Sequence, residues 1–193
     1  MLGRLSASSS MAEQRTLNPQ VLGSNPRGRT LAFLTRITME NVDWLTFAQS
    51  EPHFSAMISA RFKANEHHVL ATLRLDGSPR LSGTNVYLSE HLRIGMMAES
   101  RRVSDLRHDP RCAVHSATLD PELREGDAKL DCIAHEIGRD EAKKWLQSLG
   151  HHSETALAFE MRIARATLTQ VDGDSLRIQT WDPKNGLIVL NRN

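Results

Sequence analysis

The sequence predicts a mainly β domain of the α+β class, an antiparallel barrel with short flanking helices. Seven segments between residues 68 and 181 have the composition and alternation of strands, and we expect them to pair in meander order. Tight-turn signals separate several of these segments, and the helical patterns beside them are short. The chain has 193 residues, enough for one globular domain with some excess.

The excess lies in residues 1–38, whose composition differs from the rest. This segment holds five arginines, a single acid at Glu13 and a serine run at residues 8–10, and it has no apolar periodicity. Such a composition is typical of disorder, and the arginine- and serine-rich pattern also suits an organellar transit peptide. A third interpretation is that translation starts at Met39. We expect a disordered or non-native extension at 1–38 and a functional domain at 39–193.

Two helical segments open this domain. Residues 41–48 place Val42 and Leu45 on one helical stripe, and Pro52 ends or restarts the helix. Residues 52–62 continue with apolar side chains at helical spacing. These side chains are expected in the core: Phe54, Met57, Ile58 and Phe62.

The period then changes to that of a strand. From His68 on, the apolar residues at 69, 71, 73 and 75 share one face, and Asp76-Gly77 follows. An Asp-Gly pair between two such runs predicts a hairpin, because the turn needs positive φ angles. The return strand is RLSGTNVYL, in which Gly83 permits a bulge or a close backbone approach. A third strand, LRIGMM, comes next.

The remaining elements alternate in the same way. Ser100 is suited to cap a short helix that must stop before Pro110. Strands are predicted at 111–119 and 128–137, then a helix at 140–149, and finally a hairpin of strands at 161–169 and 175–181.

Charge and composition exclude several classes of function. The net charge of +1 argues against nucleic-acid or anionic-membrane partners, which need a basic field. No apolar run has the length of a membrane span. Cys112 and Cys132 lack the spacing of a zinc or redox motif, so we expect buried thiols in a reducing compartment, the cytoplasm. The adjacent histidine pairs at 67–68 and 151–152 face opposite ways on a strand, so no metal site is predicted.

Ser100, Arg101 and Arg102 form the candidate anion site. They lie where a strand is expected to lead into a helix, whose first-turn amides are unsatisfied and carry partial positive charge. A hydroxyl and two guanidinium groups there suit a phosphate dianion. The alternative is a solvated basic face, because charged residues follow closely in the same helix.

The second strand of the hairpin strengthens the anion interpretation. Arg80, Ser82 and Thr84 alternate along it, so their side chains project from one face. A face with these three residues suits a large polar ligand better than an aliphatic core. On the third strand, Gly95 would let a flat ring approach the backbone, and Met96 is a soft apolar neighbour for such a ring.

These motifs resemble a known family. The run LATLRLDGSPRLSGTNVYL, then LRIGMMAESRRVSDLRHDPR, and more loosely GDAKLDCIAHEI, is similar to the pyridoxamine 5'-phosphate oxidase-like split barrels that bind flavin mononucleotide (FMN). The shared features are a first strand ending in Asp-Gly-x-Pro, a strand of ligand contacts, and a third strand leading into Ser-Arg-Lys before an Asp-Pro stop. Arg102 replaces the lysine, which keeps the charge and favours bidentate phosphate contact.

The resemblance implies an antiparallel split β-barrel and a homodimer with two flavins at the subunit interface. It implies an FMN-dependent oxidoreductase acting on a small substrate. Two alternatives stay open on this scaffold: a reductase that uses the 5-deazaflavin coenzyme, and a non-catalytic protein that binds flavin or haem. The cofactor-binding residues carried over are Arg80, Ser82, Thr84, Gly95, Met96, Ser100, Arg101, Arg102 and Lys129.

The end of the chain departs from the family pattern. True pyridoxamine phosphate oxidases have a tryptophan and then an Arg-Leu-x-Pro segment that grips the substrate. Here Trp181 is followed by DPKNGLIVLNRN, without that segment. The departure argues against vitamin B6 oxidation, and it leaves Trp181 as either a structural plug or a flavin neighbour. The catalytic residues, the substrate and the electron donor are not identified by the sequence.

Overall fold

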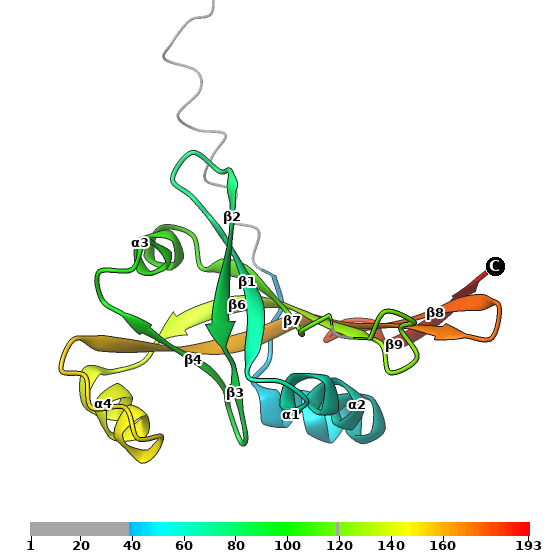
Figure 1. Cartoon of the computed structure of the whole chain (residues 1–193), viewed down its shortest axis with the longest axis horizontal. Helices are drawn as coiled ribbons and strands as arrows, with labels where there is room; N and C mark the ends of the chain where they lie inside the picture. The colour runs from blue at the N-terminus through cyan, green and yellow to red at the C-terminus, as the bar shows by residue number, and fades with distance from the viewer. Residues whose placement is uncertain (1–38, 119) are drawn as a thin grey trace, which may run out of the picture. The chain divides into compact units, whose positions relative to one another are not determined.

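The structure is a computed structural model that describes residues 39–118 and 120–193 (Figure 1). The expectations for residues 1–38 therefore lie outside the described residues. The described chain forms nine strands and four helices. In chain order they are α1 (Trp44–Ser50), α2 (Pro52–Lys63), β1 (His67–Leu73), β2 (Pro79–Asn85), β3 (Tyr87–Leu88), β4 (Leu92–Met97), α3 (Arg101–His108), β5 (Arg111–His115), β6 (Asp127–Glu136), α4 (Arg139–Ser148), β7 (Ala156–Asp172), β8 (Ser175–Asp182) and β9 (Gly186–Arg192).

The strands form one antiparallel sheet, which confirms the predicted mainly β class. Its hydrogen-bonded order is β2-β1-β5-β6-β7-β4-β3, and β8 and β9 extend from β7. This path is open, but its two ends, β2 and β3, are consecutive in the chain and separated only by Val86. The sheet must therefore curl until one segment of chain joins both of its ends, as Figure 1 shows.

The predicted meander order is wrong. β1 pairs with β5 as well as β2, and β4 pairs with β7 across more than fifty residues of sequence. The predicted return strand RLSGTNVYL is divided into β2 and β3, and the terminal strand β9 was not predicted. β7 has 17 residues, whereas the predicted strand had nine, at 161–169. It is longer because its first residues pair with β4 and its last residues pair with β8. β6 pairs with β7 along most of its length.

The buried face of β1 is not its apolar face. The apolar residues Val69, Ala71 and Leu73 do share a face, but that face points outward, and Val69 is 40% exposed. The inward face carries His68, Leu70 and Thr72. Alternation assigns residues to two faces without deciding which one is buried. Here two polar residues occupy the buried face.

The helices α1 and α2 close one side of the core with aromatic side chains. Asp43 caps α1 by accepting a hydrogen bond from the Thr46 amide, so the helix begins at Trp44, after the predicted start at 41. The Phe47 ring lies 4.5 Å from the ring of Trp181, which is 4% exposed. Trp181 is thus a structural plug of the core in this chain.

Candidate functional site

The helix α3 begins at the predicted cap. Ser100 has extended backbone angles, and its hydroxyl accepts a hydrogen bond from the Arg102 amide at 3.4 Å. Val103 and Leu106 are buried, which fixes α3 on the sheet, and Pro110 follows its end. The remaining amides of the first turn add partial positive charge at the same place. The sequence therefore predicted this helix and its start correctly.

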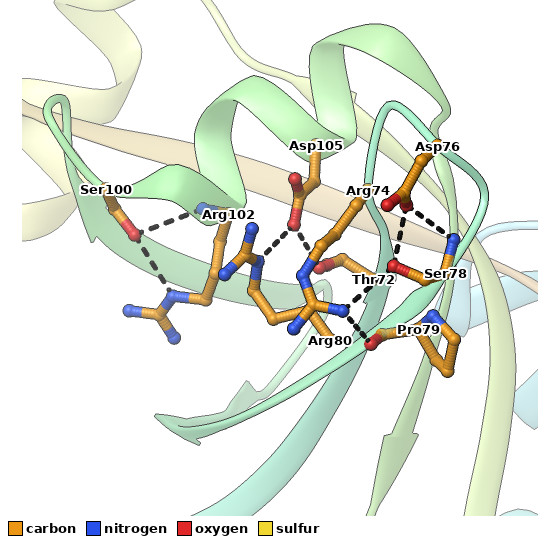
Figure 2. A network of polar contacts seen from close by, with 9 residues as sticks. All are labelled: Thr72, Arg74, Asp76, Ser78, Pro79, Arg80, Ser100, Arg102 and Asp105. Atoms are coloured by element: carbon orange, nitrogen blue, oxygen red, sulfur yellow. Dashed lines mark hydrogen bonds and ion pairs between the residues drawn. The ribbon is translucent and has the colours of Figure 1, made fainter.

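Arg102 lies half-buried beside this cap. Its Nε donates to Ser100 Oγ at 3.2 Å, and its Nη1 donates to the carbonyl oxygen of Gly83 at 2.9 Å (Figure 2 shows the contact with Ser100). Burial lowers the pKa of the guanidinium. No carboxylate of the described residues pairs with it. Arg102 is therefore a positioned cation whose protein partners are neutral oxygens.

Arg80 has a different environment, because it faces a carboxylate. Its Nε donates to Asp105 Oδ2 at 2.6 Å, and the Thr72 hydroxyl donates to the same oxygen at 2.7 Å (Figure 2). Burial would raise the pKa of Asp105, but the hydrogen bonds from Arg80 and Thr72 and the positive charge of Arg80 bring it below the usual value. Arg80 thus ties β2 to α3, and part of its hydrogen-bonding capacity is already used.

A third arginine lies at the end of β1. The Nη1 of Arg74 donates to Ser78 Oγ at 3.0 Å and to the carbonyl oxygen of Pro79 at 2.6 Å. Its charge also contributes to lowering the pKa of Asp105. Figure 2 shows Arg74, Arg80 and Arg102 in the region where β1, β2 and α3 meet. The region therefore holds three guanidinium groups and two carboxylates, Asp105 and Asp76, which leaves an excess of positive charge.

The predicted row on β2 lies on one face, as expected. Arg80, Ser82 and Thr84 are the cross-strand partners of Thr72, Leu70 and His68, which point inward. Ser82 Oγ is buried and has no hydrogen-bond partner in the described chain. Thr84 is 7% exposed, and its hydroxyl donates to the Asn85 carbonyl at 3.3 Å. Of these two hydroxyls, Ser82 has the unused capacity that a ligand would satisfy.

Gly95 and Met96 have surroundings that differ from the open, ring-binding face expected of them. A Cβ on Gly95 would lie 2.9 Å from Leu146 Cδ2, so the space above this glycine is filled by α4 and is not open to a flat ring. Met96 is 4% exposed and belongs to the core, so its side chain is not an accessible ring neighbour. The two residues face opposite sides of β4.

Lys129 and Arg101 are both exposed, at different places. Lys129 lies on β6, on the face that points outward. β1 and β5 lie between β6 and β2, a separation of about 14 Å, so one protomer does not bring Lys129 to the β2 row. Arg101 begins α3 beside Arg102 and has no ion pair with a described residue.

Sequence reasoning missed Asp105 and Thr72. Both are buried and polar: Asp105 accepts a hydrogen bond from Arg80, and Thr72 donates to the same carboxylate. A signal for Thr72 existed, because the Asp76-Gly77 hairpin places it opposite Arg80. The partner from α3 had no such signal, since its approach depends on packing between distant segments.

Two classes of site are not found in the described part of the chain. No group of three histidine, cysteine, aspartate or glutamate side chains between residues 39 and 193, apart from residue 119, is placed to hold a metal ion. None of the helices in these same residues has both the length and the apolar character to cross a membrane.

Comparison with known proteins relates this geometry to a fold. No family model matches the sequence, and no curated protein matches it. PhzG from Burkholderia lata 383, solved with tetrahydrophenazine-1-carboxylic acid, is 10% identical and superposes with a TM-score of 0.58 over 77% of this chain and 92% of PhzG. A pyridoxamine 5'-phosphate oxidase-related, FMN-binding protein from Nostoc punctiforme PCC 73102 is 11% identical, with a TM-score of 0.52 over 74% of this chain and 96% of its own.

The chain has the pyridoxamine 5'-phosphate oxidase-like fold. A protein from Listeria innocua, provisionally named a pyridoxamine 5'-phosphate oxidase, agrees with a TM-score of 0.52, at 12% identity, over 58% of this chain and 95% of its own. Identities this low show the fold alone. The resemblance seen in the sequence motifs is confirmed at the level of the fold.

Proposed function

We propose that this protein binds FMN and is an FMN-dependent oxidoreductase of the pyridoxamine 5'-phosphate oxidase-like family, acting on a small molecule. The observation that carries the proposal is Arg102, a half-buried cation oriented by Ser100 and Gly83 and without a carboxylate partner among the described residues. A partly desolvated guanidinium attracts a phosphate more strongly than a solvated one.

The cofactor phosphate would lie at the start of α3. Arg101 and Arg102 would supply charge, and Ser100 and the first-turn amides would supply further donors. The unpartnered hydroxyl of Ser82 on the neighbouring strand fits a polar ligand in the same region. Arg80, held by Asp105, would contribute to the positive field and limit how far α3 moves from β2. Bound FMN would supply the redox chemistry, since a flavin accepts or donates hydride at its own ring.

The other predicted contacts receive different support. Thr84, Gly95 and Met96 could contact FMN through their backbone only, because their side-chain positions are buried or covered by α4. Lys129 could reach a cofactor only from the second protomer of a dimer. Trp181 is excluded as a flavin neighbour by its place in the core.

We place the cofactor in a homodimer in the cytoplasm. The outward face of the sheet exposes apolar residues on β1, β2 and β9, which suits burial against a second copy. Among them are Leu81 at 72%, Leu190 at 50%, Ile188 at 47% and Val69 at 40%. The absence of an Arg-Leu-x-Pro segment after Trp181 makes vitamin B6 oxidation an improbable reaction for this chain.

The visible absorbance spectrum of the purified protein tests this proposal. Flavin bands, and tight binding of added FMN with weaker binding of riboflavin, would support it. Colourless protein that binds the 5-deazaflavin coenzyme, or protein that binds haem, would instead support one of the two alternatives. If the protein binds flavin but no electron donor supports turnover, the proposed FMN binding is supported and the proposed oxidoreductase activity is contradicted.

A further inference from the structure

A hollow of about 530 Å³ opens where β2 passes into β3, away from the arginines. The end of α2, the β2–β3 segment and α4 contribute its walls, and we call it the Trp145 hollow. Its volume lies within the range of small-molecule sites, which is roughly 300–1,000 Å³. Most of its walls are aromatic or aliphatic: Phe62, Val86, Tyr87, Leu88, Trp145 and Leu149.

The position of the Trp145 ring is fixed by its neighbours. Tyr87 meets it edge-on, with ring centroids 5.4 Å apart and planes at 90°. The Arg93 guanidinium lies 5.8 Å from the ring centroid, and Arg93 is itself held by Glu141 at 2.6 Å and Glu160 at 3.3 Å. A ring held in this way is preorganised, which favours contact with another aromatic ring.

The charges around the hollow do not favour an anion. Lys63 and Glu66 both line it and carry opposite charges, and Arg93 is paired with two carboxylates. The polar group best placed for a ligand is the Tyr87 hydroxyl, which lies 3.0 Å from His151 Nε2. The polar and charged residues of the walls are Lys63, Asn65, Glu66, Asn85 and Ser89, and polar groups among apolar walls orient a ligand.

The hollow lies next to the proposed cofactor. Gly83 accepts the hydrogen bond from Arg102 at the phosphate end, and Val86 lines the hollow. The extended chain between these two residues covers about 10 Å. A flavin whose phosphate lies at Arg102 and whose ribityl chain follows β2 would bring its ring to the edge of the hollow.

We propose that the Trp145 hollow binds a flat, uncharged aromatic molecule with one hydrogen-bonding group, such as a hydroxyl or carbonyl, directed to Tyr87. The inference that this molecule is the substrate rests on the proposed FMN function, but the binding itself does not. A neutral ring would fill the aromatic walls without leaving a buried charge unpaired, whereas a carboxylate or phosphate would meet the negative charge of Glu66 as well as the positive charge of Lys63.

Equilibrium dialysis of the full chain against naphthalen-2-ol, naphthalene-2-carboxylate and naphthalene tests the proposal. We expect naphthalen-2-ol to bind about tenfold more tightly than the carboxylate, since burial of an anion is costly and Glu66 offsets the attraction of Lys63. Tyr87→Phe should weaken the binding of naphthalen-2-ol about three- to tenfold, as expected for one lost hydrogen bond, and should leave the binding of naphthalene unchanged. Preference for the carboxylate would overturn the assignment of ligand class.

Variants at the rim locate the site. Leu149→Arg places a charge in the hollow and should weaken the binding of naphthalen-2-ol more than about tenfold. The matched control is Leu75→Arg, at a position 79% exposed and outside the hollow, which should bind like the parent. Equal binding by all three proteins would overturn the site. Trp44 and Trp181 are 7% and 4% exposed, so quenching on binding should come from Trp145 and disappear in Trp145→Phe.

The same measurements with FMN-saturated protein separate the two proposals. If the protein binds naphthalen-2-ol but not FMN, the ligand site in the hollow is supported and the proposed FMN-dependent function is contradicted. If the protein binds FMN but not naphthalen-2-ol, only the proposed ligand site in the hollow is contradicted. Competition between the two ligands would mean that the flavin ring itself occupies the hollow, which would overturn its assignment to a substrate.

Discussion

Arg102 on α3 donates a hydrogen bond to the carbonyl oxygen of Gly83 on β2, at 2.9 Å. The Arg80–Asp105 ion pair, at 2.6 Å, joins the same helix and strand a second time. The start of α3 is therefore fixed relative to β2 before any ligand binds. A preorganised donor set loses less conformational entropy on binding, which increases the affinity gained from each contact.

The first prediction concerns the two adjacent arginines. Replacing either Arg101 or Arg102 by alanine should weaken FMN binding by roughly ten- to a hundredfold, since charge-assisted hydrogen bonds contribute about 1.5–3 kcal/mol each. Riboflavin lacks the phosphate, so its affinity should change little. Calorimetric titration with both ligands measures the difference. A double alanine variant that binds FMN as well as the parent would show that these arginines are a solvated face.

The buried carboxylate of Asp105 gives the second prediction. Asp105→Asn removes the charge that Arg80 and Thr72 hydrogen-bond, and it should lower the free energy of unfolding by about 1–3 kcal/mol. The matched control is Glu136→Gln, which breaks the more exposed pair with Arg107 and should change stability by about 0–1 kcal/mol. Urea unfolding followed by circular dichroism compares them. Equal losses in both variants would contradict the role given to Asp105.

The lowered pKa of Asp105 also predicts that the stability of the protein decreases in acid. Because its pKa in the folded protein lies below the usual value of 3.8, its contribution to stability is complete above that pH and is lost as the pH falls through the folded value. Asp105→Asn should therefore reduce the slope of stability against pH below about pH 4.

Local sequence signals predicted the hairpin and α3, but not the order of the sheet. Gly77 has φ of 81°, as the Asp-Gly turn requires, and Ser100 caps α3 as predicted. These features depend on neighbouring residues. The pairing of β4 with β7 depends on packing between distant segments, which the sequence of either strand does not encode.

The site was predicted to a similar extent and for the same reason. The geometry at the start of α3, where we propose the anion site, was visible in the sequence because the cap, the arginines and the helix are contiguous. The contact between Leu146 and the position above Gly95 could not be predicted, because α4 lies about fifty residues later in the chain. The buried partner of Arg80 was hidden in the same way, since alternation along β2 places Arg80 on a face without identifying what covers it.

His68 gives the third prediction. It is 2% exposed, and neither of its ring nitrogens has a hydrogen-bond partner among the described residues. Burial lowers the pKa of His68 below 6.5, and the nearby backbone of Asn65 and Phe62 offsets only part of this effect. The unfolded chain then binds the proton more readily, so stability should be complete above about pH 6.5 and should fall at lower pH.

Unfolding midpoints in urea between about pH 5 and pH 8 measure this effect. His68→Leu should flatten the pH dependence, because the titrating group is removed. The matched control is His53→Gln, at an exposed position on α2, which should follow the parent curve. Parallel curves for the parent and His68→Leu would contradict the assignment.

Two glycines give a fourth prediction with a built-in control. A Cβ on Gly95 would approach Leu146 Cδ2 to 2.9 Å, so Gly95→Ala should displace α4 and lower the free energy of unfolding by about 1–3 kcal/mol. A Cβ on Gly83 would meet nothing within 4 Å, so Gly83→Ala should leave stability nearly unchanged. Thermal unfolding of both variants tests the contrast, and similar losses in both would contradict the packing of α4 on β4.

The last prediction concerns the outward face of β1 and β2. Leu81 is 72% exposed, and its cross-strand partner is Ala71, close to Val69, so this exposed apolar side chain lies in an apolar neighbourhood. In the proposed homodimer this face is buried, and Leu81→Arg would place an unpaired charge in the interface. We expect the variant to be monomeric by light scattering at concentrations where the parent is a dimer, and to bind FMN more weakly because the cofactor lies at the interface. Leu45→Arg, at a 51% exposed position on α1, is the matched control and should remain dimeric. A parent that is monomeric and still binds FMN tightly would contradict both the interface and the place of the cofactor within it.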